Sequence, residues 1–249
     1  LGDWSSDVCS SDLDYPHADE LVLLAPMKAE LPPEVFTRVF EPPKSDGNGF
    51  DRDNLLKASK LLDDAGWVLK NRQRVNAQTG KPLSFELLIA SGANDQWVLP
   101  FKKNLARLGV TMNIRQVDMA QLTNRKRSRD YDMMQTLWAA QPWPSSDLQI
   151  SWASGYIDSS YNAPGVKSPV VDALIAKIVA AQGDKNKLLP LGRALDRVLT
   201  WNYYMLPMWY MGEDRVARWD KFSLPAVRPV YTLGFDTWWY DVNKAAKLP

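Results

Sequence analysis

The sequence of 249 residues is poor in two residue types on which much enzyme and metal chemistry depends, with one Cys (Cys9) and one His (His17). One Cys cannot form an intramolecular disulfide, and one Cys with one His cannot build a Cys/His zinc site or a Cys–His dyad. His17 lies in a Pro- and Asp-rich stretch near the amino terminus, where a catalytic base is poorly held. The sequence therefore argues against catalytic triads that depend on His.

A strong net charge and long hydrophobic runs are also missing. The 30 Lys and Arg offset 29 Asp and Glu to a net charge of +1, so no global field attracts nucleic acid or an anionic membrane. The longest apolar runs, Leu21–Pro26 and Leu87–Ala90, fall far short of the roughly 20 residues that cross a bilayer. Hydrophobic residues at 45% and charged residues at 24% are ordinary for a soluble globular protein. The first residues lack the basic and apolar regions of a signal peptide.

Residues 1–13 (LGDWSSDVCSSDL) contain no Lys or Arg and repeat the tripeptide Ser-Ser-Asp. This string resembles a translated sequencing adapter, and we expect it to be a non-native extension; an ordinary polar tail is the alternative. Without it Cys9 disappears, and the loss of three Asp leaves 30 basic and 26 acidic residues, a net charge of +4. The near-neutral balance therefore conceals a small positive excess.

From residue 53 to residue 138 the hydrophobic pattern alternates between the helical and the strand period. Helices are predicted over 53–65, 94–108 and 118–128, strands over 83–89, 110–114 and 131–138, and a polar turn region over 71–82. The strand over 131–138 is nearly continuous in apolar residues, so we expect it to be covered on both faces. Strands separated by helices predict an α/β fold with a mainly parallel sheet.

Two more helices are predicted beyond the sheet. Ser168-Pro169 supplies an N-cap and a first-turn proline to one helix, whose apolar stripe runs over 171–178. The second helix covers 191–202, and we expect Pro207 to end it and a strand to restart at Met208–Tyr210. The last forty residues are rich in Pro and aromatic residues and predict no closing element of the same layer.

Six segments together resemble one protein family: Asp53–Trp67 (DNLLKASKLLDDAGW), Leu108–Val117 (LGVTMNIRQV), Tyr131–Trp138 (YDMMQTLW), Ser168–Ile175 (SPVVDALI), Leu195–Tyr210 (LDRVLTWNYYMLPMWY) and Leu233–Val242 (LGFDTWWYDV). In this order they look like the second half of the family 5 extracellular solute-binding proteins, the peptide-binding components of bacterial ABC importers. The last segment is similar to the subgroup that takes up oligopeptides and the peptide-nucleotide antibiotic microcin C. The resemblance spans residues 15–249 and is specific as a set.

The resemblance implies the distal α/β lobe of a fold like that of the type II periplasmic binding proteins, with a mainly parallel sheet flanked by helices. Because family members are much longer, it also implies a C-terminal fragment whose first lobe is absent. After the extension over 1–13, we expect 14–50 to be a crossing segment from that lobe. Residues 51–215 are then the ligand-binding lobe, and 216–249 return to the missing lobe.

The function implied by the resemblance is the capture of oligopeptides or peptide-like solutes in a cleft between two lobes, for delivery to an ABC permease. Such a protein works in the periplasm as a monomer, breaks no bond, has no catalytic residue and needs no cofactor or metal. Because one lobe is absent, we expect this chain alone to bind ligands weakly or not at all.

The expected cleft loop follows the strand 131–138, because open α/β sheets bind ligands at the carboxyl ends of their strands. Two Trp of this loop offer rigid apolar faces to peptide side chains. The two Ser and the Asp that close it can hydrogen-bond a peptide main chain or amine. These candidate ligand contacts are Trp138, Trp143, Ser145, Ser146 and Asp147.

Gln141 and Asn162 complete the candidate site through the resemblance. Many relatives carry Trp-x-x-Asp at the strand end, and that Asp binds the peptide α-ammonium; here Gln141 takes its place. A neutral amide cannot form this ion pair, so we expect Asp147 or the missing lobe to anchor the amine. Asn162 matches an Asn that lines the cleft in relatives, and an Asn that ends a turn is the alternative.

Two other function classes stay open. A glycoside hydrolase needs two carboxylates, but the chain has six Glu, and only Asp147 with Asp158 stands out as an acidic pair at strand ends. A Trp-rich carbohydrate-binding module is the rival without catalysis, although such modules are usually all-β and this chain has strong helical periods. The basic run over 125–129 is interpreted as a solvated face, because no aromatic residues interleave with it as in a nucleic-acid site.

The remaining Trp residues are interpreted as structural. The chain has 11 Trp, eight of them from Trp138 to Trp239. Those at helix or strand positions are predicted to be core. The pair Trp238-Trp239 lies in the return segment, so we expect it to be exposed without binding ligand. The predicted core positions are Trp152, Trp201, Trp209 and Trp219.

Overall fold

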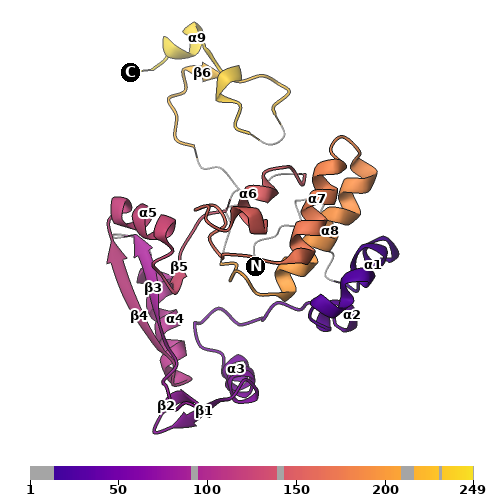
Figure 1. Ribbon diagram of the computed structural model, residues 1–249. Helices are drawn as coiled ribbons and strands as arrows, with labels where there is room; N and C mark the ends of the chain where they lie inside the picture. Colours follow the sequence, from indigo (N-terminus) through magenta and orange to yellow (C-terminus); the bar gives the residue numbers. More distant parts are fainter. Residues whose placement is uncertain (1–13, 91–94, 139–142, 209–215, 230–231, 249) are drawn as a thin grey trace. The chain divides into compact units, whose positions relative to one another are not determined.

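The computed structural model describes residues 14–90, 95–138, 143–208, 216–229 and 232–248 (Figure 1). These residues form two compact units, one reaching to Leu206 and the other starting at Pro207. The described residues of the first unit bury two hydrophobic clusters, one between a sheet and a helix and one among helices.

A parallel sheet organises the first cluster. Its strands are β3 (Ser84–Ala90), β4 (Thr111–Val117) and β5 (Met133–Met134), and β3 lies between the other two and pairs with both in parallel (Figure 1). Leu87 and Ile89 of β3 pack with Met112 of β4 and Val98 of α4 (Asp95–Arg107), and all four are buried. The predicted α/β fold with a parallel sheet is confirmed.

Local signals in the sequence explain the ends of the helices beside this sheet. Asp118 caps α5 (Met119–Ser128), because its Oδ1 accepts a hydrogen bond of 2.8 Å from the backbone N–H of Gln121. Gly109 follows α4 with φ of +81°, and a Cβ there would lie 2.9 Å from the backbone nitrogen of Arg74. Glycine is therefore required at position 109 both by the backbone conformation and by the close approach.

The strand predicted over 131–138 is much shorter than expected. Only Met133 and Met134 pair with β3, at an edge of the sheet, and both side chains are half-buried rather than covered on both faces. The apolar residues that follow pack elsewhere, since Trp138 stacks on Trp152 of the helical cluster. A run of apolar residues predicts that the segment is buried, but it does not predict which part of the protein packs against the segment.

A hairpin begins at Trp67 and extends into the region 71–82 that was predicted to be a polar turn. The helix α3 (Arg52–Asp64) precedes it, and its strands β1 (Trp67–Lys70) and β2 (Gln73–Asn76) pair antiparallel. The two turn residues, Asn71 and Arg72, have φ of 49° and 64°. Left-handed conformations at both central residues are typical of the tightest hairpins, and here no glycine signalled the turn.

The second cluster is helical and contains α7 and α8 at its centre. Ser168 caps α7 through a hydrogen bond of 3.4 Å from the Val171 N–H to its Oγ, as predicted. The predicted stripe of α7 is confirmed, since Leu174 and Ile178 are fully buried. The helices of this cluster are α1 (Ala18–Leu24), η2 (Ala25–Glu30), α2 (Glu34–Thr37), α6 (Leu148–Trp152), α7 (Pro169–Ala180) and α8 (Lys185–Trp201), and the short η3 (Ser154–Tyr156) follows α6.

A buried ion pair attaches α1 to α8. The Nε of Arg197 donates to Oε2 of Glu20 at 2.8 Å, and the side chains are 2% and 0% exposed. The same guanidinium donates to the backbone carbonyl of Asp14 at 2.8 Å. The residues from Asp14 onward therefore belong to the helical cluster through a contact that the sequence pattern did not reveal.

The helix α8 ends at Trp201, well before Pro207, so the predicted end was too late. The side-chain amide of Asn202 donates to the carbonyl of Val198 at 2.7 Å, and Tyr203 then takes φ of +52°, which stops the helix. Met208 belongs to no strand, and Trp209 and Tyr210 lie outside the described residues.

The unit from Pro207 onward is small and mostly irregular. Its elements are β6 (Phe222–Ser223), η4 (Phe235–Thr237), β7 (Trp239–Tyr240) and α9 (Val242–Ala245), and β6 pairs antiparallel with β7. Trp152 and Trp201 in the helical cluster are buried as predicted, but Trp219 of the small unit is 66% exposed. The prediction of a core Trp219 was wrong, because the described residues of its segment are mostly irregular and pack no layer over it. Of the pair expected to be exposed, Trp239 is half exposed, whereas Trp238 is partly buried and donates to the Leu233 carbonyl at 3.1 Å.

Candidate ligand-binding site

A pocket of about 340 Å³ lies at the carboxyl end of β5. The carboxyl edge of a parallel sheet is the place at which open α/β folds bind their ligands. Two residues of the predicted site, Trp138 and Asp147, meet in it. The lining comes from α5, from the segment after β5, from α6 and its cap, and from the loop after α6: Lys126, Thr136, Leu137, Trp138, Asp147, Ile150, Ser151 and Tyr161.

Trp138 forms a fixed apolar wall of the pocket. Its ring stacks on the buried ring of Trp152, with centroids 4.8 Å apart and planes 29° from parallel. A ring held in this way offers contact area at low entropic cost. Trp143 does not line the pocket; it packs against the helical cluster, and the Lys185 ammonium lies 5.1 Å from its ring centroid.

Asp147 brings an available carboxylate to the pocket. It is the N-terminal cap residue of α6, but its side chain makes no capping hydrogen bond. Its backbone N–H donates to the Oγ of Ser145 at 3.2 Å, which fixes the turn. Within the described part of the chain no ion pair or hydrogen bond engages the carboxylate, and the residue is exposed. A cation brought by a ligand can therefore bind Asp147 without displacing a protein partner.

The other predicted contacts of the loop do not gather at the pocket. Ser145 accepts the hydrogen bond from Asp147 and so stabilises the loop, and Ser146 is exposed. Neither Ser lines the pocket. Gln141 lies outside the described residues.

Lys126 is a pocket residue that the sequence did not single out. It is half-buried on α5, its Nζ donates to the Thr136 Oγ1 at 3.5 Å, and burial lowers its pKa from the usual value of a lysine. In the sequence it lies inside the basic run 125–129, where its neighbours have the same charge. No signal in the pattern distinguishes it from the lysines and arginines that face solvent.

The basic run is not simply a solvated face, so that interpretation was wrong for three of its members, Lys126 in the pocket and two arginines. Arg125 pairs with Asp130 at 3.0 Å. Arg129 donates to the backbone carbonyls of Ser159 and Asn162, at 3.2 and 2.9 Å. Arg125 also lies 3.8 Å from Glu86 of β3. Both guanidinium groups thus reach other segments, which a run of like charges does not predict. The bonds of Arg129, the C-cap residue of α5, hold the loop that carries Tyr161 against the end of this helix.

Asn162 is fully buried and uses its side chain within the loop. Its Nδ2 donates to the carbonyls of Ala153 and Val166, and its Oδ1 accepts from the N–H of Val166 at 2.9 Å. It does not line the pocket. The geometry therefore supports the alternative of an Asn that closes a turn, and the side chain acts by shaping the loop.

Replacing Asn162 by Ala is expected to lower the free energy of unfolding by about 1–3 kcal/mol, because the buried N–H and C=O of Val166 lose their partner. Urea denaturation of the complete protein measures this change. Asn124→Ala, at an exposed position of α5, is the matched control and is expected to change stability little. Equal effects of the two substitutions would contradict the structural role.

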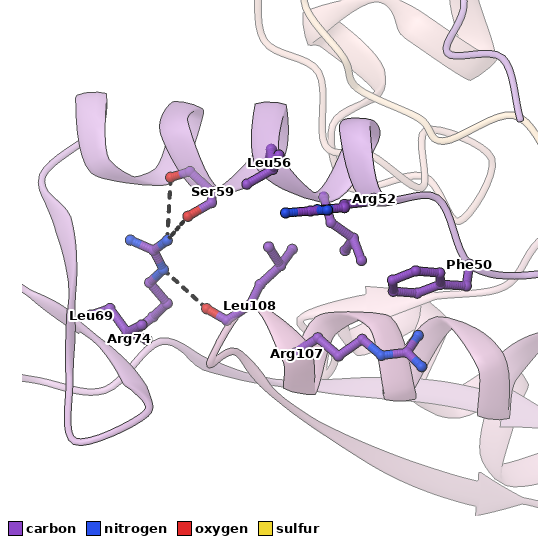
Figure 2. A pocket seen from close by; sticks show the side chains of 9 residues that line it. Phe50, Arg52, Leu56, Ser59, Leu69, Arg74, Arg107 and Leu108 are labelled. Atoms are coloured by element: carbon purple, nitrogen blue, oxygen red, sulfur yellow. Dashed lines mark hydrogen bonds between the residues drawn. The ribbon is translucent and has the colours of Figure 1, made fainter.

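A second pocket, of about 260 Å³, lies between α3, the β1–β2 hairpin and the end of α4 (Figure 2). Figure 2 shows the Arg74 side chain reaching Ser59 of α3 and the backbone carbonyl of Leu108. Arg74 also donates to Asp63 at 2.5 Å and to the carbonyl of Trp67 at 2.8 Å. All five N–H groups of the guanidinium are thus engaged within the protein, so Arg74 has none left for a ligand.

The chemistry that the first pocket offers is ionic and apolar binding. An ammonium and a carboxylate lie among aromatic and aliphatic side chains, which suits a ligand with separated charges and an apolar body. Asp158 does not line the pocket, so the acidic pair proposed for a hydrolase is not brought together there. Among the described residues no three His, Cys, Asp or Glu lie close enough to hold a metal, and no helix is long and apolar enough to span a membrane.

Two relatives show what the sequence is similar to. YejA of Escherichia coli K12 is 73% identical over 236 residues, which cover 95% of this chain and 39% of that protein. A probable peptide-binding protein, YejA of Agrobacterium fabrum C58, is 40% identical over 94% of this chain and 38% of its own length. The chain thus spans about two fifths of the length of these relatives.

A solved structure shares the fold. The oligopeptide-binding protein AppA from Bacillus subtilis, in complex with a nonapeptide, matches 77% of this chain and 39% of its own with a TM-score of 0.53 and 18% identity. The fold is therefore that of part of a type II periplasmic binding protein. Residues 27–160, more than half of this chain, match the family model described as bacterial extracellular solute-binding proteins, family 5 Middle. The chain belongs to family 5 of the bacterial extracellular solute-binding proteins.

Proposed function

We propose that this chain carries the ligand-binding lobe of the substrate-binding component of an ABC importer, which captures oligopeptides or peptide-like solutes in the periplasm and delivers them to a membrane permease. Membership of family 5 and the peptide-binding description of the Agrobacterium relative support this proposal. The observation that carries it is the pocket at the carboxyl end of the sheet, which is lined by Trp138 and by Asp147, whose carboxylate has no partner among the described residues.

The proposed organisation is a two-lobe clamp of which this chain supplies one lobe. In this proposal residues 51–215 carry the binding lobe, and 14–50 and 216–249 lead to the other lobe, with α1 of the first segment packed on α8 of the binding lobe. Exposed aromatic residues in the last segment, Trp219, Phe235 and Trp239, support this division, because they offer apolar surface that a further lobe would cover. The complete protein acts as a monomer and breaks no bond.

In this mechanism Asp147 binds the α-ammonium of the peptide, and Trp138 packs against an adjacent side chain. Closure of the second lobe over the pocket removes water, which strengthens the ion pair by lowering the local dielectric. In this mechanism the protein selects peptides by the positive charge of their amino terminus and by the fit of an apolar side chain against Trp138. Ser145 contributes indirectly, because its hydrogen bond to the Asp147 N–H holds the carboxylate at the pocket.

Replacing Asp147 by Asn in the complete protein is expected to weaken binding of peptides with a free amino terminus by about tenfold to a hundredfold, the contribution of one charged hydrogen bond. Isothermal titration calorimetry with tetraalanine and with N-acetylated tetraalanine measures the effect. The acetylated peptide lacks the ammonium, so its affinity is expected to respond little to the substitution.

Asp158→Asn is the matched control, because this exposed carboxylate lies near in sequence but does not line the pocket. Unchanged affinity for tetraalanine in Asp147→Asn would remove Asp147 from the proposal. The same titration with oligosaccharides tests the carbohydrate-binding alternative, and chromatography of the titrated peptides and sugars tests hydrolysis. Tight sugar binding without peptide binding, or cleavage of either ligand, would overturn the proposed function.

A further inference from the structure

The loop after α6 is closed on itself and brings Tyr161 to the pocket that contains Asp147. The buried amide of Asn162 joins the two ends of this loop, since it donates to the carbonyls of Ala153 and Val166. The Tyr161 side chain is 67% exposed, and its hydroxyl has no hydrogen bond to another described residue. The ring is therefore available to a ligand, whereas the backbone that carries it is fixed.

Arg129 supplies the bonds that hold this backbone against the end of α5. Its Nη2 donates to the carbonyls of Ser159 and Asn162 at 3.2 and 2.9 Å, on either side of Tyr161 in the sequence. Gly165 of the same loop approaches so closely that a Cβ there would lie 3.2 Å from the Arg129 Nη1. The position of Tyr161 therefore depends on a side chain that does not itself line the pocket.

The end of α5 does not by itself require an arginine. Arg129 is the C-cap residue and has φ of +55°, a left-handed conformation that favours glycine at the end of a helix. An arginine in this conformation costs backbone free energy, and the bonds of its side chain to the loop offset that cost. The loop, rather than the helix, therefore explains why an arginine stands at this position.

We propose that Arg129 is a positioning residue for ligand capture, which fixes the loop so that the ring of Tyr161 contacts the bound ligand. This inference rests on the proposed peptide capture, in which Asp147 binds the amine. The ring gives contact area at low entropic cost only while the loop is held in place. Without the guanidinium, binding has to order the loop, and the affinity falls.

The test is a double-mutant cycle in the complete protein, with the affinity for tetraalanine measured by isothermal titration calorimetry. Arg129→Gly removes the guanidinium but suits the left-handed backbone, so the helix end is expected to keep its conformation. Arg129→Gly and Tyr161→Ala are each expected to weaken binding about threefold to tenfold, and the double variant no more than either alone. An arginine with a merely structural role would change stability without this coupling.

Three further variants keep the test sharp. Arg129→Lys is expected to retain part of the affinity, because an ammonium reaches fewer of the carbonyls. Tyr131→Phe removes a second bond to the loop, the 2.8 Å hydrogen bond from the Tyr131 hydroxyl to the Ala163 carbonyl, and is expected to weaken binding even if Arg129→Gly does not fold. Arg127→Gln, at an exposed position of the same helix, is the control and is expected to bind like the native protein.

Native affinity in Arg129→Gly or in Tyr161→Ala would overturn the inference. Losses that multiply in the double variant would also overturn it, because Arg129 would then not act through Tyr161. If the native protein does not bind tetraalanine, the proposed function falls with it. If binding depends on Asp147 but not on Arg129, only the present inference falls.

Discussion

Replacing Glu20 by Ala is expected to lower the free energy of unfolding by about 3–5 kcal/mol, the usual cost of removing one partner from a buried ion pair. Arg197 would remain with its charge enclosed, since its side chain is 2% exposed and its Nε donates to Glu20. The substitution weakens the packing of α1 against α8, because Glu20 lies on α1 and Arg197 on α8 (Figure 1). Hydrogen exchange of the α8 amides measures the opening of this cluster by itself.

The double variant Glu20→Leu with Arg197→Met separates the buried charge from the packing of α1. It is expected to recover most of the stability, because an apolar pair of similar volume leaves no charge enclosed. Asp64→Asn is the control, since its pair with Lys60 is exposed on both sides, and little change is expected. A double variant as unstable as Glu20→Ala would show that the loss does not come from the uncompensated charge.

Replacing Arg74 by Met is expected to lower the free energy of unfolding by about 2–4 kcal/mol. The guanidinium joins three segments, because it donates to Ser59 and to the carbonyl of Leu108 (Figure 2). It also donates to the carbonyl of Trp67. Met keeps the stem but leaves the enclosed carbonyls without donors. Hydrogen exchange and limited proteolysis within 67–82 are expected to show faster opening of the hairpin.

Arg74→Lys is expected to recover part of the loss, because an ammonium reaches fewer of these acceptors than the planar guanidinium does. Arg72→Met is the control in the same hairpin, at an exposed turn position with φ of 64°. If Arg72→Met and Arg74→Met open the hairpin equally, the contribution of the buried guanidinium is refuted.

Much of the fold was predictable because it depends on short-range signals. The capping Asp118 and Ser168 and the stripe of α7 each act within a few residues, and the structure confirms all three. The parallel sheet followed from the alternation of helices and strands. The length of β5 did not, because pairing with β3 competes with the packing of Trp138 on the helical cluster.

The candidate site was predictable only in part, for a similar reason. Trp138 and Asp147 were found because they follow a strand at the carboxyl edge of a parallel sheet. Lys126 was missed because a basic run carries no sign of which member is half-buried. Asn162 was expected to line the cleft or to close a turn, and only its hydrogen bonds to Ala153 and Val166 favoured the turn.

The sequence by itself determined the class of fold, the scarcity of His and Cys, and the resemblance to solute-binding proteins. Composition, periodicity and motifs are all properties of the linear sequence. The tertiary structure decided which charges are paired and which are available. Arg197 and Arg74 are enclosed with partners, whereas Lys126 and Asp147 reach the pocket without an ionic partner among the described residues. Pairing depends on distances between segments up to 177 residues apart, and no local pattern encodes such distances.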